Sequence, residues 1–327
     1  MPRTVSSPPE APDHSSAQPQ DRRGLLNSFE IRLMMRELMN EQGVSLKHLL
    51  KDLDVSPGIM DDPGLRLTLN QEMALYTRCA ELNSDSMLGF KVGARLSAAD
   101  YGILGYAVLG AATVEEALGL LTEFAPLISW ASRNKLSKET YKRKKKSTPC
   151  RCLTLYPAAP NPQAAALEMD STVASLQAMF NDLAGESLQF ACVQLTRSGE
   201  GLDHDYLNDM FNCDIQFNSK RNALLISEKL AQLKLPHPQP EYRDLFHDLC
   251  KKSMASLLED QGMLDTLRGL IRDGLGQPEG GQVLGIDNAA KHFDMSARSL
   301  RRYLAGMGLT FRAVLDEERY SLAGQYL

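Results

Sequence analysis

Cysteine, tryptophan and long apolar runs are scarce in this sequence. The 327-residue chain has six cysteines and one tryptophan, and the scattered cysteines do not form the dense pattern of a secreted disulfide framework. The longest weakly polar stretch, residues 101–114, ends at Glu115 and Glu116 and is too short to span a membrane. The proline-rich first residues lack the apolar segment of a signal peptide. We therefore expect a reduced, cytoplasmic protein with no membrane partner.

An excess of positive charge is also absent. The chain carries 36 Lys and Arg against 41 Asp and Glu, a formal net charge of −5. This balance argues against basic charge over the whole surface but permits one local basic face. The apolar content of 43% and the charged content of 24% are those of an ordinary globular protein, which excludes wholesale disorder. The length suggests two domains plus tails.

The first 240 residues are predicted to form a flexible tail and then an α+β domain. Residues 1–22 are polar and proline-rich and cannot bury enough apolar area to order the chain. In residues 23–240, apolar spacing and capping residues predict helices near 31–38, after Ser45, from Asn70, after Thr113 and over 163–183, the last ended by Gly185. Strand patterns occupy 128–136, 150–156, 188–195 and two parts of 211–226. Because helices and strands come in runs, an α+β fold is favoured over a wound parallel sheet.

The last third of the chain is predicted to be helical and divided by a linker. Residues 241–273 repeat leucines at helical spacing and are assigned as a dimerisation or connecting helix. Residues 274–282 are rich in glycine and are assigned as a linker. The remaining segment, 283–327, is predicted to be a separate all-α unit.

Within that unit, residues 286–308 have the pattern of a helix-turn-helix. Ile286, Ala289, Ala290 and Phe293 line one face of a short helix. After a tight connection, Ser296 has the hydroxyl needed to cap a second helix. The apolar face of that second helix consists of Leu300, Leu304 and Met307, and Gly308 ends it.

The other face of the second helix carries Arg298, Arg301 and Arg302. Arginine presents a planar donor fork that matches guanine O6 and N7 and also binds phosphate. Between residues 284 and 312 the basic side chains exceed the acidic ones by three, which leaves −8 for the rest of the chain. Further candidate DNA contacts are Lys291, Ser296, Ser299 and Arg312. The pattern alone leaves open a plain helical hairpin with a solvated arginine face.

Residues 288–304, with Gly308–Phe311 and Leu315–Arg319, resemble the first helix-turn-helix of AraC/XylS-type transcription regulators. Upstream, residues 101–107, 113–121, 211–217 and 221–223 are similar to the arabinose-binding-like N-terminal domain of one AraC subgroup, so the resemblance covers residues 25–327. It implies that positions 298, 301 and 302 face the major groove. The implied partners are double-stranded DNA with operator half-sites, a small-molecule effector and a second copy of the chain.

The resemblance also implies a second helix-turn-helix beyond the joining helix, which residues 311–327 would begin, and the sequence stops at Leu327. A single reading helix contacts few phosphates, so we expect weak binding by a monomer and recovery of affinity in a dimer. The alternative function is a sensor or dimerisation partner whose incomplete module binds DNA weakly.

An effector pocket in the N-terminal domain is implied by the resemblance. Tyr101, Tyr106, Trp130 and Phe217 are candidate lining residues, with core packing as the alternative for each.

Other motifs carry weaker indications of chemistry. The basic run 142–146 suits an exposed hairpin tip or a nucleic-acid patch, and Cys150 with Cys152 suits structural thiols better than half of a metal site. Residues 203–205, Asp-His-Asp, could serve acid–base catalysis but also suit a helix start, and no nucleophile motif accompanies them. Residues 274–281 lack the spacing of a dinucleotide site. We therefore expect no enzyme activity, no metal and no cofactor.

Overall fold

The computed structural model describes residues 26–27, 29–53, 55–62, 65–67, 69–128, 133–143, 146–275, 285–306 and 309–323. It divides into two compact units, one of residues 24–267 and one containing residues 268–327. The division falls within a single long helix, α10 (Pro240–Leu275). The predicted tail, and most of the predicted linker, lie outside the described residues.

The first unit begins with a small helical layer. It contains α1 (Phe29–Gln42), α2 (Leu46–Leu49), the short 3-10 helix η1 (Pro57–Met60) and α3 (Leu69–Leu82), with strands β1 (Leu26–Asn27) and β2 (Arg66–Leu67) paired antiparallel. The residues predicted to repeat along α1, Ile31, Met34, Met35 and Leu38, are all fully buried. Helix α2 begins after Ser45, as predicted, and Ser45 caps it, because its Oγ accepts the His48 N–H at 3.3 Å. Helix α3 begins one residue before the predicted start at Asn70, so Asn70 lies within the first turn and does not cap the helix.

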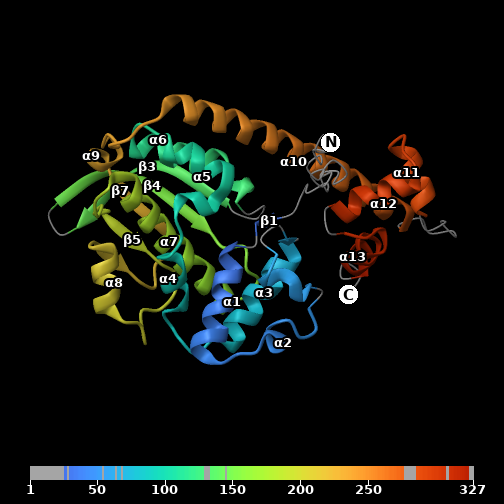
Figure 1. Ribbon diagram of the computed structural model, residues 1–327, viewed down its shortest axis with the longest axis horizontal. Helices are drawn as coiled ribbons and strands as arrows, with labels where there is room; N and C mark the ends of the chain where they lie inside the picture. Colours follow the sequence, from blue (N-terminus) through green and yellow to red (C-terminus); the bar gives the residue numbers. More distant parts are fainter. Residues whose placement is uncertain are drawn as a thin grey trace, which may run out of the picture. The chain divides into compact units, whose positions relative to one another are not determined.

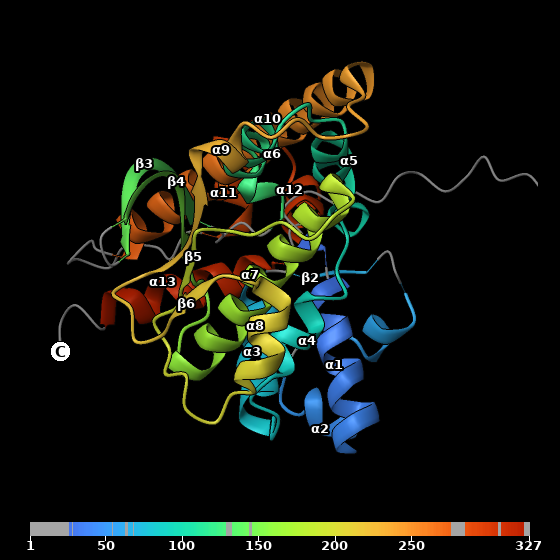
Figure 2. The same cartoon turned by 90° about the vertical axis from the view of Figure 1, so that its left-hand side faces the viewer.

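A five-stranded sheet forms the centre of this unit (Figures 1 and 2), with the order β3-β4-β7-β5-β6. Its strands are β3 (Arg133–Arg143), β4 (Lys146–Tyr156), β5 (Cys192–Gln194), β6 (Asp214–Gln216) and β7 (Asn222–Ser227). All neighbours pair antiparallel except β5 and β6. Of the basic run 142–146, Lys142, Arg143 and Lys146 lie at the paired ends of β3 and β4, and residues 144–145 lie outside the described residues. Strands β3 and β4 both extend further towards the residues that join them than predicted, because pairing between the two strands includes polar residues.

The two faces of the sheet pack against different groups of side chains. Leu153, Leu155, Val193, Leu224 and Ile226 belong to the main hydrophobic core. Helices α5 (Gly102–Leu109), α6 (Val114–Glu123) and α7 (Pro162–Ala184) contribute to the same core. The opposite face has a smaller buried cluster that includes Tyr141 and three cysteines.

Helix α7 was the best-predicted long element. Asn161 caps its start by accepting the Ala164 N–H at 2.8 Å, and Gly185 ends it in the left-handed region at φ 67°. Helix α4 (Leu88–Gly93) packs closely on α7 through glycines. A Cβ on Gly93 would lie 2.2 Å from the Ser171 carbonyl oxygen, and one on Gly89 would lie 2.7 Å from Asp170 Cβ. The close approach therefore requires glycine at both positions.

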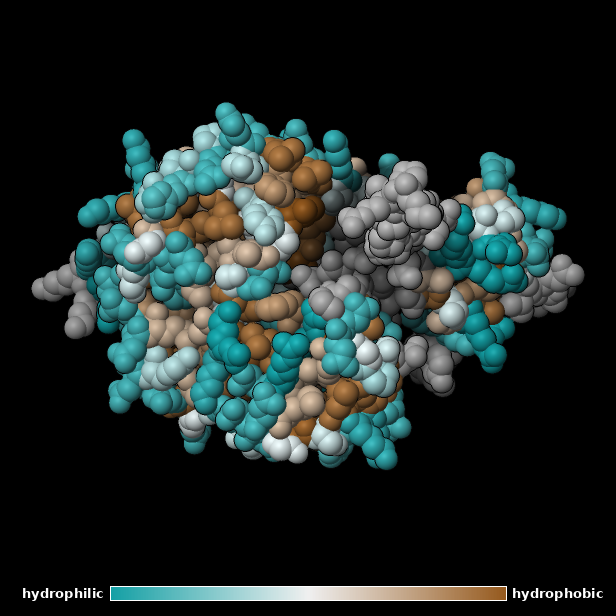
Figure 3. All heavy atoms as spheres, viewed as in Figure 1, coloured by the Kyte–Doolittle hydropathy of each residue, from teal (hydrophilic) through white to brown (hydrophobic). Residues whose placement is uncertain are grey.

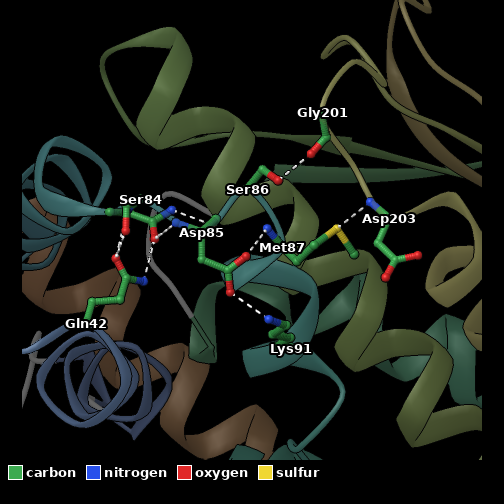
Figure 4. Close-up of polar contacts among 9 residues, drawn as sticks. Gln42, Ser84, Asp85, Ser86, Met87, Lys91, Gly201 and Asp203 are labelled. Carbon is green, nitrogen blue, oxygen red and sulfur yellow. Dashed lines mark hydrogen bonds and ion pairs between the residues drawn. The ribbon is translucent and has the colours of Figure 1, made fainter.

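Polar contacts fix the loop before α4 to segments on both sides (Figure 4). Gln42 of α1 accepts the Ser84 N–H at 2.8 Å, and Ser86 Oγ donates to the Gly201 carbonyl at 2.6 Å. The Asp85 carboxylate accepts the Met87 N–H at 2.9 Å and pairs with Lys91 at 2.7 Å. The loop therefore joins the helical layer to the region that precedes α8 (His204–Phe211).

The remaining elements of this unit are short. They are the 3-10 helices η2 (Ala98–Tyr101) and η3 (Ala125–Leu127) and the helix α9 (Glu228–Ala231).

The second unit consists of the end of α10 with α11 (Ile286–His292), α12 (Ala297–Gly306) and α13 (Phe311–Ala323). The helix pair predicted from residues 286–308 is present, joined by residues 293–296. Its buried apolar residues are Ile271, Ala289, Ala290, Leu300, Leu304 and Val314. Arg268 and Arg272 of α10 form ion pairs with Glu318 of α13, and Arg268 also pairs with Glu317 at 3.1 Å. Glu318 is buried, so these pairs fix α13 against the end of α10.

Candidate ligand cavity and nucleic-acid interface

The outer face of α12 presents three arginines. Arg298, Arg301 and Arg302 are exposed, while Leu300 and Leu304 on the opposite face are fully buried. Within the part of the chain that the structure describes, none of the three guanidinium groups forms an ion pair. Each therefore keeps its donors available for an external anion or base edge.

The start of α12 is capped by Ser296, as the sequence predicted. The Ser296 Oγ accepts the Ser299 N–H at 3.0 Å and lies 2.9 Å from Ser299 Oγ. Lys291 on α11 is exposed and belongs to the same small unit. Arg312 is also exposed, and its guanidinium lies 3.7 Å from Asp316 within α13. The two serines thus have a local structural role beside any external contact.

The first unit encloses a cavity of about 120 Å³. Its walls come from α1, α3, η2, α6, η3, β3, β4 and α7, so segments between residues 29 and 179 meet there. Most of the wall is apolar, with Leu121, Leu153, Leu155, Met169 and Met179 among the contributors. Aromatic rings and carboxyl groups complete it, and no lysine or arginine among the described residues lines it.

Three glutamates from three helices face this cavity. Glu30 lies on α1, Glu72 on α3 and Glu168 on α7. Glu30 accepts a hydrogen bond from the Tyr76 hydroxyl at 2.8 Å. Glu168 accepts the N–H groups of Ala158 and Ala159 at 2.9 and 2.8 Å. Glu72 is 6% exposed, and its Oε2 accepts no hydrogen bond from any residue that the structure describes.

Burial is the main cause of the shifted acidity of these carboxyls. It raises the pKa of Glu72 well above its ordinary value, and the neighbouring carboxyls of Glu30 and Glu168 raise it further. Burial raises the pKa of Glu168 to about 7, although two backbone N–H groups stabilise its anion. Burial also raises the pKa of Glu30, against the hydrogen bond from Tyr76. The carboxyls of the cavity wall therefore ionise less readily than carboxyls in water do.

Of the four predicted effector contacts, Tyr101 lines this cavity. Tyr106 does not, because it points outward from α5, is 46% exposed and stacks on Phe246 with ring centroids 5.1 Å apart. Phe217 does not either, since it follows the edge strand β6 and packs against Gly199 and His204. Trp130 lies outside the described residues.

The sequence reasoning missed the glutamates and Asn134, which also lines the cavity. One signal was available for Glu168, because it directly follows three alanines and a leucine. Glu30 and Glu72 gave no comparable signal, since each lies in the first turn of a helix, where acidic residues are common.

The discounted motifs have structural roles. Asp203 caps α8 by accepting the Tyr206 N–H at 3.0 Å, so residues 203–205 form a helix start. Cys150 and Cys152 are buried in the sheet, and burial raises the pKa of both thiols. Among the residues that the structure describes, no group of three His, Cys, Asp or Glu is arranged to hold a metal ion.

An apolar surface lies over α5 and the first turns of α10 (Figure 3). We call it the α5–α10 patch and define it as Tyr106, Leu109, Tyr242, Leu245 and Leu249, each at least 37% exposed. The two helices are in close contact, because a Cβ on Gly110 would lie 2.7 Å from Arg243 Cβ. Arg243 in turn pairs with Glu116 of α6 at 2.6 Å. The patch is therefore a fixed surface of the first unit.

Comparison with known proteins identifies relatives of both parts of the chain. Residues 43–248 match the family model described as the arabinose-binding domain of AraC transcription regulator, N-terminal. The ornithine utilization regulator of Pseudomonas aeruginosa is 26% identical over 89% of this chain and 82% of its own length. An uncharacterised HTH-type transcriptional regulator of Mycobacterium bovis is 24% identical over 88% of this chain and 81% of its own.

A solved structure, the transcriptional regulator CdpR from Pseudomonas aeruginosa, is 21% identical. The superposition covers 91% of this chain and 85% of the CdpR chain, with a TM-score of 0.49. In the present structure, none of the described helices is long and apolar enough to cross a bilayer.

Proposed function

Because the chain belongs to the AraC transcription regulators whose N-terminal half is the arabinose-binding domain, we propose that it binds operator DNA through α12 and responds to a small molecule. The observation that supports DNA reading most directly is the set of three exposed arginines on one face of α12. A recognition helix needs long donors of this kind, because its backbone cannot reach the base edges in the major groove.

The proposed roles divide between bases and phosphates. Arg298, Arg301 and Arg302 contact base edges or adjacent phosphates, and Lys291 and Arg312 contact the backbone. Phosphate contacts fix the register of a protein on DNA, whereas base contacts carry the sequence information. Ser296 and Ser299 contribute mainly by holding the start of α12.

The proposed regulator acts as a homodimer. The α5–α10 patch supports this, because a dimer with twofold symmetry buries the same apolar patch of both copies. Two copies also present two reading helices to paired half-sites, which raises the affinity beyond that of one helix.

The effector site of the proposed regulator is the cavity of the first unit. Leu121 of α6 lines the cavity, and Glu116 of the same helix is paired with Arg243 of α10. Helix α10 continues into the second unit, where Arg268 and Arg272 pair with α13. A ligand that favours one position of α6 therefore biases α10 and changes the population able to bind DNA.

The experiment is selection of DNA from the source genome. The purified chain is incubated with genomic fragments, and the retained fragments are sequenced beside those kept by a variant with Arg298, Arg301 and Arg302 all replaced by Ala. We expect discrete sites with paired half-sites that the variant loses. Arg302→Ala alone should weaken binding to the preferred site by about 1–3 kcal/mol if it makes a bidentate base contact.

Arg95→Ala is the matched control, because Arg95 is an exposed arginine of the first unit and should leave the selected sites unchanged. Retention of no fragments, or equal retention of all fragments by both proteins, would contradict sequence-specific reading. The chain would then act as a sensor or dimerisation partner.

A further inference from the structure

Among the residues that the structure describes, acidic side chains line the cavity of the first unit and no lysine, arginine or histidine does. Glu72 Oε2 accepts no hydrogen bond from the described residues, and the same is true of Asn134 Oδ1 on β3. Both atoms are buried; Asn134 Oδ1 can only accept, and Glu72 Oε2 accepts when its carboxyl is ionised. A buried acceptor without a donor costs free energy, so the wall is complementary to a ligand that brings N–H groups.

The charge of the wall also favours a ligand that carries N–H groups. Glu30, Glu72 and Glu168 come from three helices, and none of them forms an ion pair with a described residue. A positive group placed among them would replace the missing counter-ion. An anionic ligand would instead add charge to a site that already disfavours it.

The remaining lining residues suit the rest of such a ligand. Phe29, Tyr76, Tyr101 and Tyr156 present aromatic rings, which attract cations through their faces. The leucines and methionines of the wall suit an alkyl chain. Protonated amines on a short apolar chain combine all three properties.

We infer that this cavity binds a small organic ammonium ion, with Glu72 as its principal carboxylate partner. The inference rests on the proposed effector site and specifies the chemical class of the ligand. Asn134 Oδ1 accepts a second N–H of the same group, and the aromatic rings surround its alkyl part.

Binding of the cation is coupled to loss of a proton from the wall. The titratable groups that face Glu72 across the cavity are Glu30, Tyr76, Asp100, Tyr101, Tyr156 and Glu168. Burial and the neighbouring carboxyls favour the protonated acid in the empty cavity. The ammonium ion favours the carboxylate, so the proton is released to solvent on binding, and affinity rises as the pH rises through the pKa of the wall carboxyl.

The test uses isothermal titration of the full chain with three probes of similar size: n-hexylammonium, 1-hexanol and hexanoate. We expect hexylammonium to bind at least tenfold more tightly than 1-hexanol, and hexanoate to bind more weakly than either. Glu72→Gln should reduce the affinity for hexylammonium at least tenfold and leave that for 1-hexanol unchanged. Glu41→Gln, at an exposed position of α1, should change neither.

The unchanged binding of 1-hexanol also shows that the Glu72→Gln variant is folded. Equal or tighter binding of 1-hexanol by the unmodified chain would overturn the assignment, and so would full affinity of the variant for hexylammonium. The DNA selection does not depend on these probes. Selected operators with no Glu72-dependent amine binding would refute the ligand class alone, whereas amine binding without selected operators would refute the regulator alone.

Discussion

The three cavity glutamates are individually ordinary and become unusual only together. Glu30 and Glu72 lie in the first turns of their helices and Glu168 lies inside α7, yet all three line one cavity that no described arginine or lysine lines. Asp170 on the same helix as Glu168 contrasts with them, because it is 1% exposed and pairs with Arg197. Asp170 has a cationic partner, whereas Glu72 Oε2 has no hydrogen-bond partner among the described residues, and the proposed ligand would supply one.

These carboxyls predict how stability depends on pH. Burial raises the folded-state pKa of Glu72 above its ordinary 4.5, so the folded chain binds this proton more tightly than the unfolded chain does. The contribution of this proton to the free energy of unfolding is therefore fully present below about pH 4.5 and is lost as the pH rises through the folded-state pKa of Glu72. The unfolding free energy of Glu72→Gln should therefore rise relative to that of the unmodified chain as the pH is raised from about 5 to about 8.

Urea unfolding at the two pH values, with Glu41→Gln as control, measures this difference. Parallel pH profiles for Glu72→Gln and the unmodified chain would show that Glu72 ionises as easily in the folded state as in the unfolded one.

The cavity could not be found from sequence because its members are far apart along the chain. Glu30, Glu72 and Glu168 are joined by the packing of α1, α3 and α7, and no local pattern encodes that packing. The arginine face of α12 was visible because Arg298, Arg301 and Arg302 are neighbours on one helix. Tyr106 and Phe217 were chosen by residue type alone, and type does not determine the direction in which a ring points.

At the scale of elements, the same distinction explains what was predicted. The predicted caps by Thr113 and Ser296 depend on neighbours within three residues, and both are present. Ser45 and Asn161 also cap helices, which was not predicted. The predicted bounds of β3, β5 and β6 were less accurate. A strand ends where its pairing with a neighbouring strand ends, and that neighbour can be distant in sequence. β5 and β6 retain three residues each, since they pair only over that length.

The contact between α4 and α7 makes a prediction at this scale. Gly93→Ala places a methyl group 2.2 Å from the Ser171 carbonyl oxygen and 2.8 Å from Ala174 Cβ, so the helices must separate. We expect a loss of about 1–3 kcal/mol in unfolding free energy. Gly119→Ala is the matched control, because Gly119 lies inside α6 with nothing within 4 Å of its added Cβ.

The control should gain about 0.5–1 kcal/mol through helix propensity. Thermal and urea unfolding of the two variants measure both changes. A Gly93→Ala variant as stable as the unmodified chain would mean that α4 can move away from α7 at little cost.

At the scale of the whole molecule, the α5–α10 patch makes a prediction about assembly. Leu245 is 55% exposed in the middle of the patch, and Leu245→Glu introduces a charge that an apolar dimer interface would have to desolvate. We expect the variant to sediment as a monomer at concentrations where the unmodified chain is a dimer, and to lose affinity for paired half-sites.

Lys251→Glu is the control, because Lys251 is an exposed residue of α10 on a different side of the helix from Leu245. It should leave the dimer intact. A monomeric unmodified chain, or a dimer that tolerates Leu245→Glu, would place the interface elsewhere.

The strand order of the sheet has a consequence for synthesis. β7 lies between β4 and β5 and is the last of the five strands to leave the ribosome. Until residue 227 has emerged, the β3–β4 hairpin and β5 each present an edge that no native neighbour can cover. Such edges recruit other nascent chains as readily as the correct strand. The yield of soluble protein from an expression host should therefore depend on how quickly residues 157–227 are translated and on chaperones that bind exposed strands meanwhile.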